Sequence, residues 1–94
     1  MNMRIEVTQD DIDGGLRYDS NRCPLSSAMH RALGRPVSIG LRAWSYGTGT
    51  LAEMTTWTPL PQGVVEWNTI FDKQGHQAVK PMQFEVEIPI IKEK

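Results

Sequence analysis

The stretch that decides the fold is NRCPLSSAMHRALG, residues 21–34. Pro24 suits the first position of a helix, where its missing N–H costs no hydrogen bond, and Gly34 suits the left-handed position just past the end. The apolar residues between them recur at helical spacing and form one stripe, which consists of Leu25, Ala28, Met29, Ala32 and Leu33. A helix this short is not stable alone in water, so we expect a sheet to bury the stripe.

Four segments with alternating apolar and polar residues predict the strands of that sheet. The first is Met3–Val7 and the last is Gln83–Ile88, whereas 37–44 and 51–58 form a central pair. A two-residue turn at Gly47-Thr48 joins the central pair and sets its register. In that register Arg42 is opposite Glu53, Trp44 is opposite Leu51, and Ser38 is opposite Trp57.

Two further helices are predicted from their end signals. Thr8 and Asp11 resemble a capping box, which predicts one short turn of helix through Asp13. A longer helix is expected from Pro61 to Gln74, with Gly75 just beyond its end. Its predicted inner stripe is Val64, Trp67, Ile70, Phe71 and Gln74.

The β-α-β-β-α-β order of the main elements predicts a single α+β domain over residues 1–94. It is the split βαβ order of ferredoxin-like domains, in which two helices cover one face of an antiparallel sheet. The expected order of neighbouring strands is 4-1-3-2. An arrangement with the central hairpin curled over as a separate pair stays open.

Composition and charge narrow the classes of function. The 94 residues include ten basic and eleven acidic ones, and the net charge of −1 argues against non-specific DNA binding. A single cysteine excludes an internal disulfide framework and a Cys-rich zinc site. No apolar run is long enough for a membrane span or a signal peptide, so we expect a cytoplasmic protein without a membrane partner.

No group of residues indicates catalysis. Cys23 and His30 lie two helical turns apart, too far for a thiolate–imidazole pair. The acidic residues Asp10, Asp11 and Asp13 match a calcium loop poorly and suit the start of a helix instead. No hydrolase, phosphate-loop, dinucleotide or zinc-protease motif is present. We therefore expect a protein that is not an enzyme, with no catalytic residue, metal or cofactor.

The face of the sheet opposite the helices is the predicted interaction surface. Two tryptophans on a solvent face exceed what monomers usually expose, and Gly40 would leave a gap between them. The predicted partner-binding residues are Arg42, Trp44, Leu51, Glu53 and Trp57. The alternative is that the segment 16–22, or the C-terminal tail, folds over this face.

A second candidate function is the binding of a small ligand or nucleotide between the sheet and the segment 16–22. Arg17, Tyr18 and Arg22 would supply the contacts. RNA binding is disfavoured, because the first strand has no aromatic residue and Glu85 and Glu87 would repel phosphate. Nucleic acid is therefore not an expected partner.

Several short motifs carry a resemblance to known sequences. They are Thr8–Asp13, Cys23-Pro24-Leu25, Trp67, Phe71-Asp72 and Pro81–Val86. Together they resemble a group of small uncharacterised proteins from bacteriophages and bacteria, with a Cys-Pro helix start, a Phe-Asp helix end and a Pro-x-x-Phe final strand. The resemblance implies a phage-type accessory protein that binds and blocks a host protein, for example one of a defence complex, or that associates with itself. A phage protein of this kind would act in the host cytoplasm.

Overall fold

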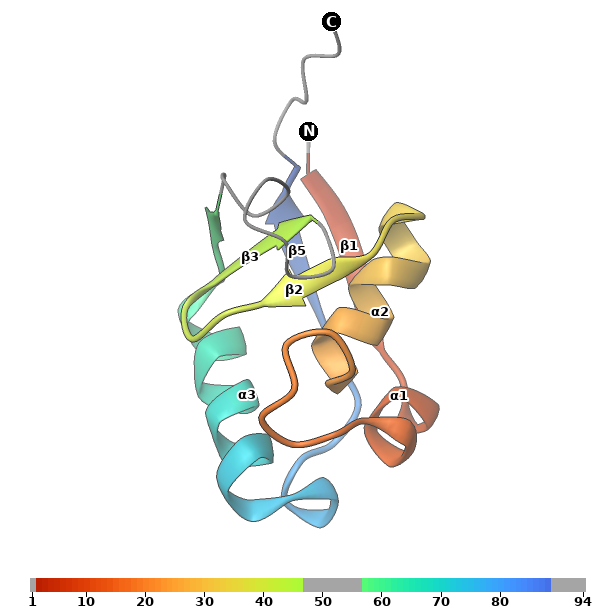
Figure 1. Cartoon of the computed structure of the whole chain (residues 1–94), viewed down its shortest axis with the longest axis vertical. Coiled ribbons are helices and arrows are strands. Elements are labelled where there is room, and N and C mark those ends of the chain that lie inside the picture. The colour runs from red at the N-terminus through yellow and green to blue at the C-terminus, as the bar shows by residue number, and fades with distance from the viewer. Residues whose placement is uncertain (1, 47–56, 89–94) are drawn as a thin grey trace, which may run out of the picture.

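Three helices and two small antiparallel sheets form an α+β fold in the computed structural model, which describes residues 2–46 and 57–88 (Figure 1). The helices are α1 (Gln9–Gly14), α2 (Pro24–Leu33) and α3 (Gln62–Gln74), with a short 3-10 turn η1 (His76–Ala78). The strands are β1 (Asn2–Val7), β2 (Val37–Ile39), β3 (Ala43–Tyr46), β4 (Thr58–Pro59) and β5 (Met82–Glu87).

The helix α2 has the bounds and the buried stripe that its sequence predicts. It begins at Pro24 and ends before Gly34, whose φ of 72° is left-handed and whose N–H donates to the carbonyl of His30. Leu25 and Met29 are fully buried. Because α2 contacts both β1 and β2, it fills the space between the two sheets.

The capping box at the start of α1 is also confirmed. The Asp11 N–H donates to Thr8 Oγ1 at 3.2 Å, and the Thr8 N–H donates to Asp11 Oδ2 at 2.9 Å. The helix ends at Gly14, and Gly15 donates to the carbonyl of Ile12. Asp11 therefore accepts the hydrogen bond from the Thr8 N–H that a longer glutamate usually accepts in this motif.

The strands β1 and β5 form an antiparallel ribbon, with Ile5 opposite Phe84. Its inner face holds Ile5, Val7 and Val86, which are at most 4% exposed, and its outer face is polar. Both strands, and their position as neighbours, are as predicted. The alternation of burial along each strand is the pattern of a sheet that water reaches on one side.

The central strands differ from the prediction. In the described residues β2, β3 and β4 form a separate three-stranded sheet, so the single ferredoxin-like sheet is not confirmed. This separation corresponds to the arrangement in which the central hairpin curls over. In Figure 1, β2 and β3 cross in front of β1 and β5, with α2 on one side and α3 on the other.

The predicted register of the central hairpin is wrong. The chain turns back directly after Ile39, and the Gly40 N–H donates to the carbonyl of Ala43 at 2.7 Å. Ile39 is consequently opposite Trp44, and Trp44 is opposite Thr58 on its other side. Directly opposed residues share a face, so Trp44 follows Ile39 into the core. The alternating pattern from 37 to 44 concealed this turn.

The helix α3 ends as predicted but buries a different stripe. Gly75 follows it with a φ of 92°, which favours glycine. Val64, Asn68 and Phe71 are the buried residues, whereas Ile70 is 39% exposed. The predicted inward positions of Ile70 and Gln74 are therefore wrong, and Asn68, a polar residue, lies on the buried face instead.

The core joins residues from both sheets and all three helices. Its fully buried large side chains are Ile5, Ile12, Leu25, Met29, Trp44 and Phe71. No helix in the described ranges is long and apolar enough to cross a membrane.

Candidate functional site

The structure separates the five predicted partner-binding residues. Trp44 is 0% exposed and lies in the core, contrary to its predicted place on an open face. Arg42 and Trp57 are exposed. Leu51 and Glu53, with the predicted Gly47-Thr48 turn, lie outside the described residues. The open face with Trp44 and Trp57 side by side is therefore wrong.

Part of that face is covered by the segment 16–22. Ser38, predicted to face solvent, is 0% exposed. Asn21 Nδ2 donates to Ser38 Oγ at 2.8 Å, and the Ile39 N–H donates to the carbonyl of Ser20 at 2.8 Å. The segment therefore lies against β2, whereas the alternative of a segment folded over both tryptophans does not apply, because Trp44 is in the core.

The residues predicted to bind a ligand have different roles. Arg17 lies at the end of α3, where its Nε and Nη2 donate to the carbonyls of Asp72 and Lys73 at 2.7 and 2.6 Å. A cation there satisfies the free carbonyls and opposes the negative end of the helix dipole. Tyr18 has a left-handed φ of 57°, and its N–H donates to Asp72 Oδ1 at 2.9 Å. Arg22 is exposed.

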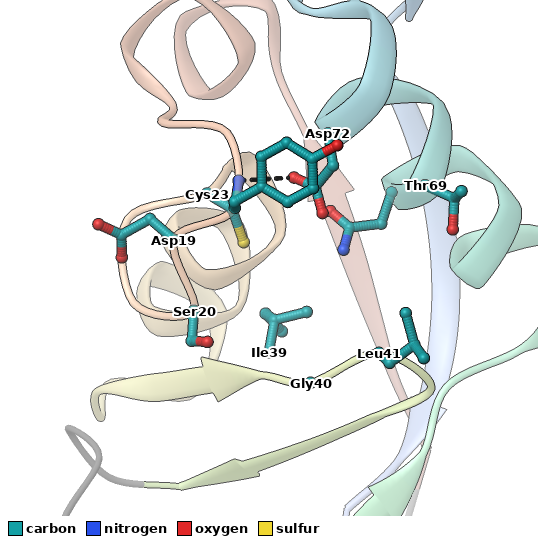
Figure 2. A pocket seen from close by; sticks show the side chains of 10 residues that line it. Asp19, Ser20, Cys23, Ile39, Gly40, Leu41, Thr69 and Asp72 are labelled. Carbon is teal, nitrogen blue, oxygen red and sulfur yellow. Dashed lines mark hydrogen bonds between the residues drawn. The ribbon is translucent and has the colours of Figure 1, made fainter.

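A pocket of about 220 Å³ lies where the segment 16–22, the β2–β3 turn and α3 meet (Figure 2). The residues that line it are Tyr18, Asp19, Ser20, Cys23, Ile39, Gly40, Leu41, Asn68, Thr69 and Asp72. We call it the loop–helix pocket. Tyr18 is thus the one member of the predicted ligand-binding trio that lines it.

The pocket lining carries two carboxylates and no lysine or arginine. Asp72 reaches from α3 toward the loop, whereas Asp19 turns its carboxylate away from α3 (Figure 2). Each uses one oxygen to hold the loop: Asp72 Oδ1 accepts from Tyr18, and Asp19 Oδ1 accepts from the backbone N–H groups of Asn21 and Arg22. The pocket therefore has negative charge beside apolar walls.

Cys23 contributes bulk to the pocket, not reactivity. The residue is 2% exposed, and burial raises the pKa of its thiol above the ordinary value. A thiol is a poor nucleophile when it stays protonated. Cys23 is thus a small buried residue at the start of α2.

Asn68 is the residue of the pocket that the sequence prediction missed. It is only 9% exposed, and its Oδ1 has no hydrogen-bond partner among the described residues. The spacing of Val64, Asn68 and Phe71 is i, i+4 and i+7, which marks one helix face. A polar residue on an otherwise buried face was the signal in the sequence, since buried polar groups are rarely left unpaired.

Large exposed side chains surround the same region. Leu41 is 78% exposed, Tyr18 71% and Trp57 41%. A β-carbon added to Gly40 would lie 3.0 Å from the Trp57 ring, so this ring rests directly on Gly40. The gap predicted beside Gly40 is therefore occupied by Trp57. We call Tyr18, Leu41, Arg42 and Trp57 the turn surface.

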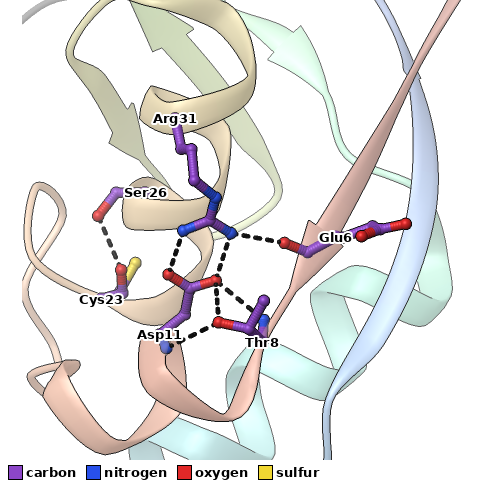
Figure 3. A network of polar contacts seen from close by, with 6 residues as sticks. All are labelled: Glu6, Thr8, Asp11, Cys23, Ser26 and Arg31. Carbon is purple, nitrogen blue, oxygen red and sulfur yellow. Dashed lines mark hydrogen bonds and ion pairs between the residues drawn. The ribbon is translucent and has the colours of Figure 1, made fainter.

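A second polar cluster joins α1, α2 and β1 (Figure 3). Arg31 Nη1 and Nη2 donate to the two carboxylate oxygens of Asp11 at 2.8 and 2.7 Å, and Nη2 also donates to the carbonyl of Glu6 at 3.0 Å. Burial alone would raise the pKa of Asp11, but hydrogen bonds from Arg31 and Thr8 outweigh it and lower that pKa. Every oxygen of the carboxylate is bonded within the fold, so we interpret this cluster as structural.

Within residues 2–46 and 57–88, no group of three or more His, Cys, Asp or Glu side chains could hold a metal ion. No protein-family model matches the chain, and no curated protein or solved structure matches it. The functional proposal therefore depends on the pocket and the surface around it.

Proposed function

We propose that this chain is a non-enzymatic protein-interaction module that binds its partner through the turn surface. The observation that carries the proposal is the exposure of Leu41, Tyr18 and Trp57 beside one pocket. Large apolar side chains that stay in water next to a concavity are typical of protein interfaces. Trp and Tyr are also the residue types most often found as energetic centres of such interfaces.

The turn surface replaces the open sheet face of the original hypothesis but keeps two of its residues. Arg42 sits beside Leu41 at the tip of the β2–β3 turn, and Trp57 covers the glycine at the start of that turn. Leu41 and Arg42 are both exposed, so a large partner can reach the tip of this turn. The proposed partner is a host protein, such as a defence protein blocked by a phage-type accessory protein, or a second copy of this chain.

The pocket favours this function over binding of a nucleotide. Phosphate groups need cations or free N–H groups, whereas the pocket is lined by Asp19 and Asp72. Of the two cations in the ligand hypothesis, Arg17 already donates to two carbonyls of α3, and Arg22 does not line the pocket. A phosphate in this pocket would meet repulsion without a compensating contact.

The experiment compares the wild-type chain with a Leu41→Ser/Trp57→Ser double variant. A partner captured from host lysate is identified by mass spectrometry and purified, and its affinity for both chains is measured directly. Light scattering of the chain alone tests self-association. We expect the double variant to weaken the interaction by about thirtyfold or more, because two interface centres are removed.

The matched control is Ile70→Ser, which removes another exposed apolar side chain that does not line the pocket. Thermal unfolding of all variants shows whether each remains folded. The proposal fails if the control weakens binding as much as the double variant does. It also fails if a monomeric wild-type chain retains no protein partner.

A further inference from the structure

We propose that the loop–helix pocket receives a basic side chain, a guanidinium or ammonium group, of the partner protein. This inference deepens the proposed function and rests on it. It assigns to the pocket a ligand chemistry that the exposed apolar residues alone do not define.

The first observation is the charge of the lining. Asp72 and Asp19 line the pocket, and none of the other lining residues carries a positive charge. Each carboxylate uses its Oδ1 for backbone N–H groups, and no hydrogen bond to either Oδ2 is present among the described residues. Asp72 is the better placed of the two carboxylates to accept a hydrogen bond from a cationic group. Its carboxylate reaches toward the loop, whereas that of Asp19 points away from α3 (Figure 2). A cationic group would gain a charge-assisted hydrogen bond there.

The second observation is independent of charge. Asn68 lines the pocket with a side chain that is more than nine-tenths buried, and its Oδ1 lacks a partner among the described residues. A buried acceptor that is left unpaired is destabilising. A donor-rich group that enters the pocket can remove this cost if the Asn68 amide turns toward it. Guanidinium and ammonium groups carry only donors, five and three respectively.

The walls of the pocket suit the alkyl stem of such a side chain. Ile39 and Leu41 provide apolar surface, and Tyr18 provides an exposed aromatic ring at the rim. Lysine and arginine bury their methylene groups along surfaces of this kind, and a cation near an aromatic face is attracted to it. The pocket thus combines apolar sides with negative and acceptor groups.

The chain's own nearest cation does not fill this position. The Arg17 guanidinium lies 5.9 Å from the centre of the Tyr18 ring but donates to the carbonyls at the end of α3. Arg17 is not among the lining residues. It therefore positions the loop and leaves the Asp72 carboxylate to an incoming group.

The test uses a ¹⁵N-labelled full chain and two probes, N-acetylarginine methylamide and its citrulline counterpart. Citrulline has nearly the shape of arginine but no charge. We expect the arginine probe to shift the NMR signals of Tyr18, Ile39 and the Asn68 side-chain amide, with a Kd on the order of 1 mM or weaker for a ligand so small. The citrulline probe should bind at least about tenfold more weakly.

Two variants keep the loop in place while removing charge. Asp72→Asn retains an oxygen that can accept from the Tyr18 N–H, and we expect it to weaken the arginine probe about tenfold. Asp19→Asn should have a smaller effect, because its carboxylate points away. The control is Glu66→Gln, which removes one negative charge from the exposed side of the same helix. Asn68→Leu should also weaken the probe.

The outcomes separate this inference from the proposed function. The basic-side-chain site is overturned if the arginine probe leaves the pocket signals unchanged, if citrulline binds equally well, or if Glu66→Gln weakens binding as much as Asp72→Asn. Partner binding that still depends on Leu41 and Trp57 would then leave the proposed function standing. Conversely, probe binding with no dependence of the partner on the turn surface would retain the site and refute the function.

Discussion

The β1–β5 ribbon and the β2–β3 hairpin are both antiparallel pairs, but water reaches them differently. The outer face of the ribbon is polar, with Arg4 opposite Glu85 and Glu6 opposite Gln83, and it is exposed. The hairpin has no comparable face: Ser38 and Ser45, opposite each other, are 0% and 3% exposed. The ribbon covers the core with its inner face and meets water with its outer face, whereas the hairpin is buried on both faces.

This difference explains where apolar side chains meet solvent. In the ribbon, the apolar residues point inward, although Met3, Met82 and Phe84 are only partly buried, and the outer positions are polar or charged. In the hairpin, the opposed pairs Ser38–Ser45 and Ile39–Trp44 are buried on both faces, whereas the turn between the strands is exposed. Leu41 lies in that turn and, at 78%, has the highest exposed fraction among the large apolar side chains of the described residues.

Truncation of Trp44 is expected to have the largest effect on stability. We expect Trp44→Ala to lower the free energy of unfolding by about 3 to 5 kcal/mol, because it empties the largest buried site. A domain of this size has a total of about 5 to 15 kcal/mol. Val86→Ala, the ribbon counterpart, should cost about 2 kcal/mol. Chemical denaturation measures both, and equal costs would contradict an enclosed hairpin.

Beside the ribbon, the Arg31–Asp11 ion pair contributes to stability. We expect Asp11→Asn to cost about 2 kcal/mol at neutral pH, since it weakens the bonds to Arg31, whose side chain is 54% exposed. The lowered pKa of Asp11 means that the folded state holds its proton less tightly than the unfolded state does. This stabilisation is therefore present above the ordinary carboxyl pKa and is lost as the pH falls through the lowered value.

Denaturation of the wild-type and Asp11→Asn chains at a series of pH values measures this effect. The difference between them should be constant near neutral pH and shrink below about pH 4. A difference that does not change with pH would mean that the charge of Asp11 contributes nothing to the free energy of unfolding.

The smallest effects come from two glycines, Gly40 in the β2–β3 turn and Gly63 in α3. In Gly40→Ala the new β-carbon would lie 3.0 Å from the Trp57 ring and 3.2 Å from the Ala43 carbonyl, so we expect a loss of about 1 kcal/mol. In Gly63→Ala, within α3, the β-carbon meets nothing within 4 Å, and a gain of up to about 1 kcal/mol is expected. Thermal unfolding distinguishes the two signs. A gain at Gly40 would show that Trp57 does not rest there.

The sequence predicts the parts of the fold that depend on local signals. Pro24 and Gly34 bound α2, Thr8 and Asp11 start α1, and Gly75 follows α3. Each of these residues acts on its own backbone or on one a few positions away, so its role can be predicted without tertiary contacts. The alternation in β1 and β5 is equally local.

The hairpin register and the pocket could not be predicted in the same way. An unbroken alternation runs through Ile39 and Leu41, and nothing local distinguishes a straight strand from a turn at Gly40. The pocket brings together Tyr18, Ile39 and Asn68, and the Arg31–Asp11 pair spans twenty positions. Such contacts depend on how the elements pack, which periodicity does not encode. Asn68 is the exception, because a polar residue on a buried face was visible in the sequence.

The hydrogen bonds of Arg17 and Tyr18 to Asp72 and Lys73 also bear on the order of folding. They join residues that are more than fifty positions apart, whereas α2 and its caps need only neighbours. Contacts at such separation form late, because a long loop must close first. The segment 16–22 therefore stays unanchored until α3 has formed and packed. The loop–helix pocket, which this segment and α3 both line, is thus completed late in folding.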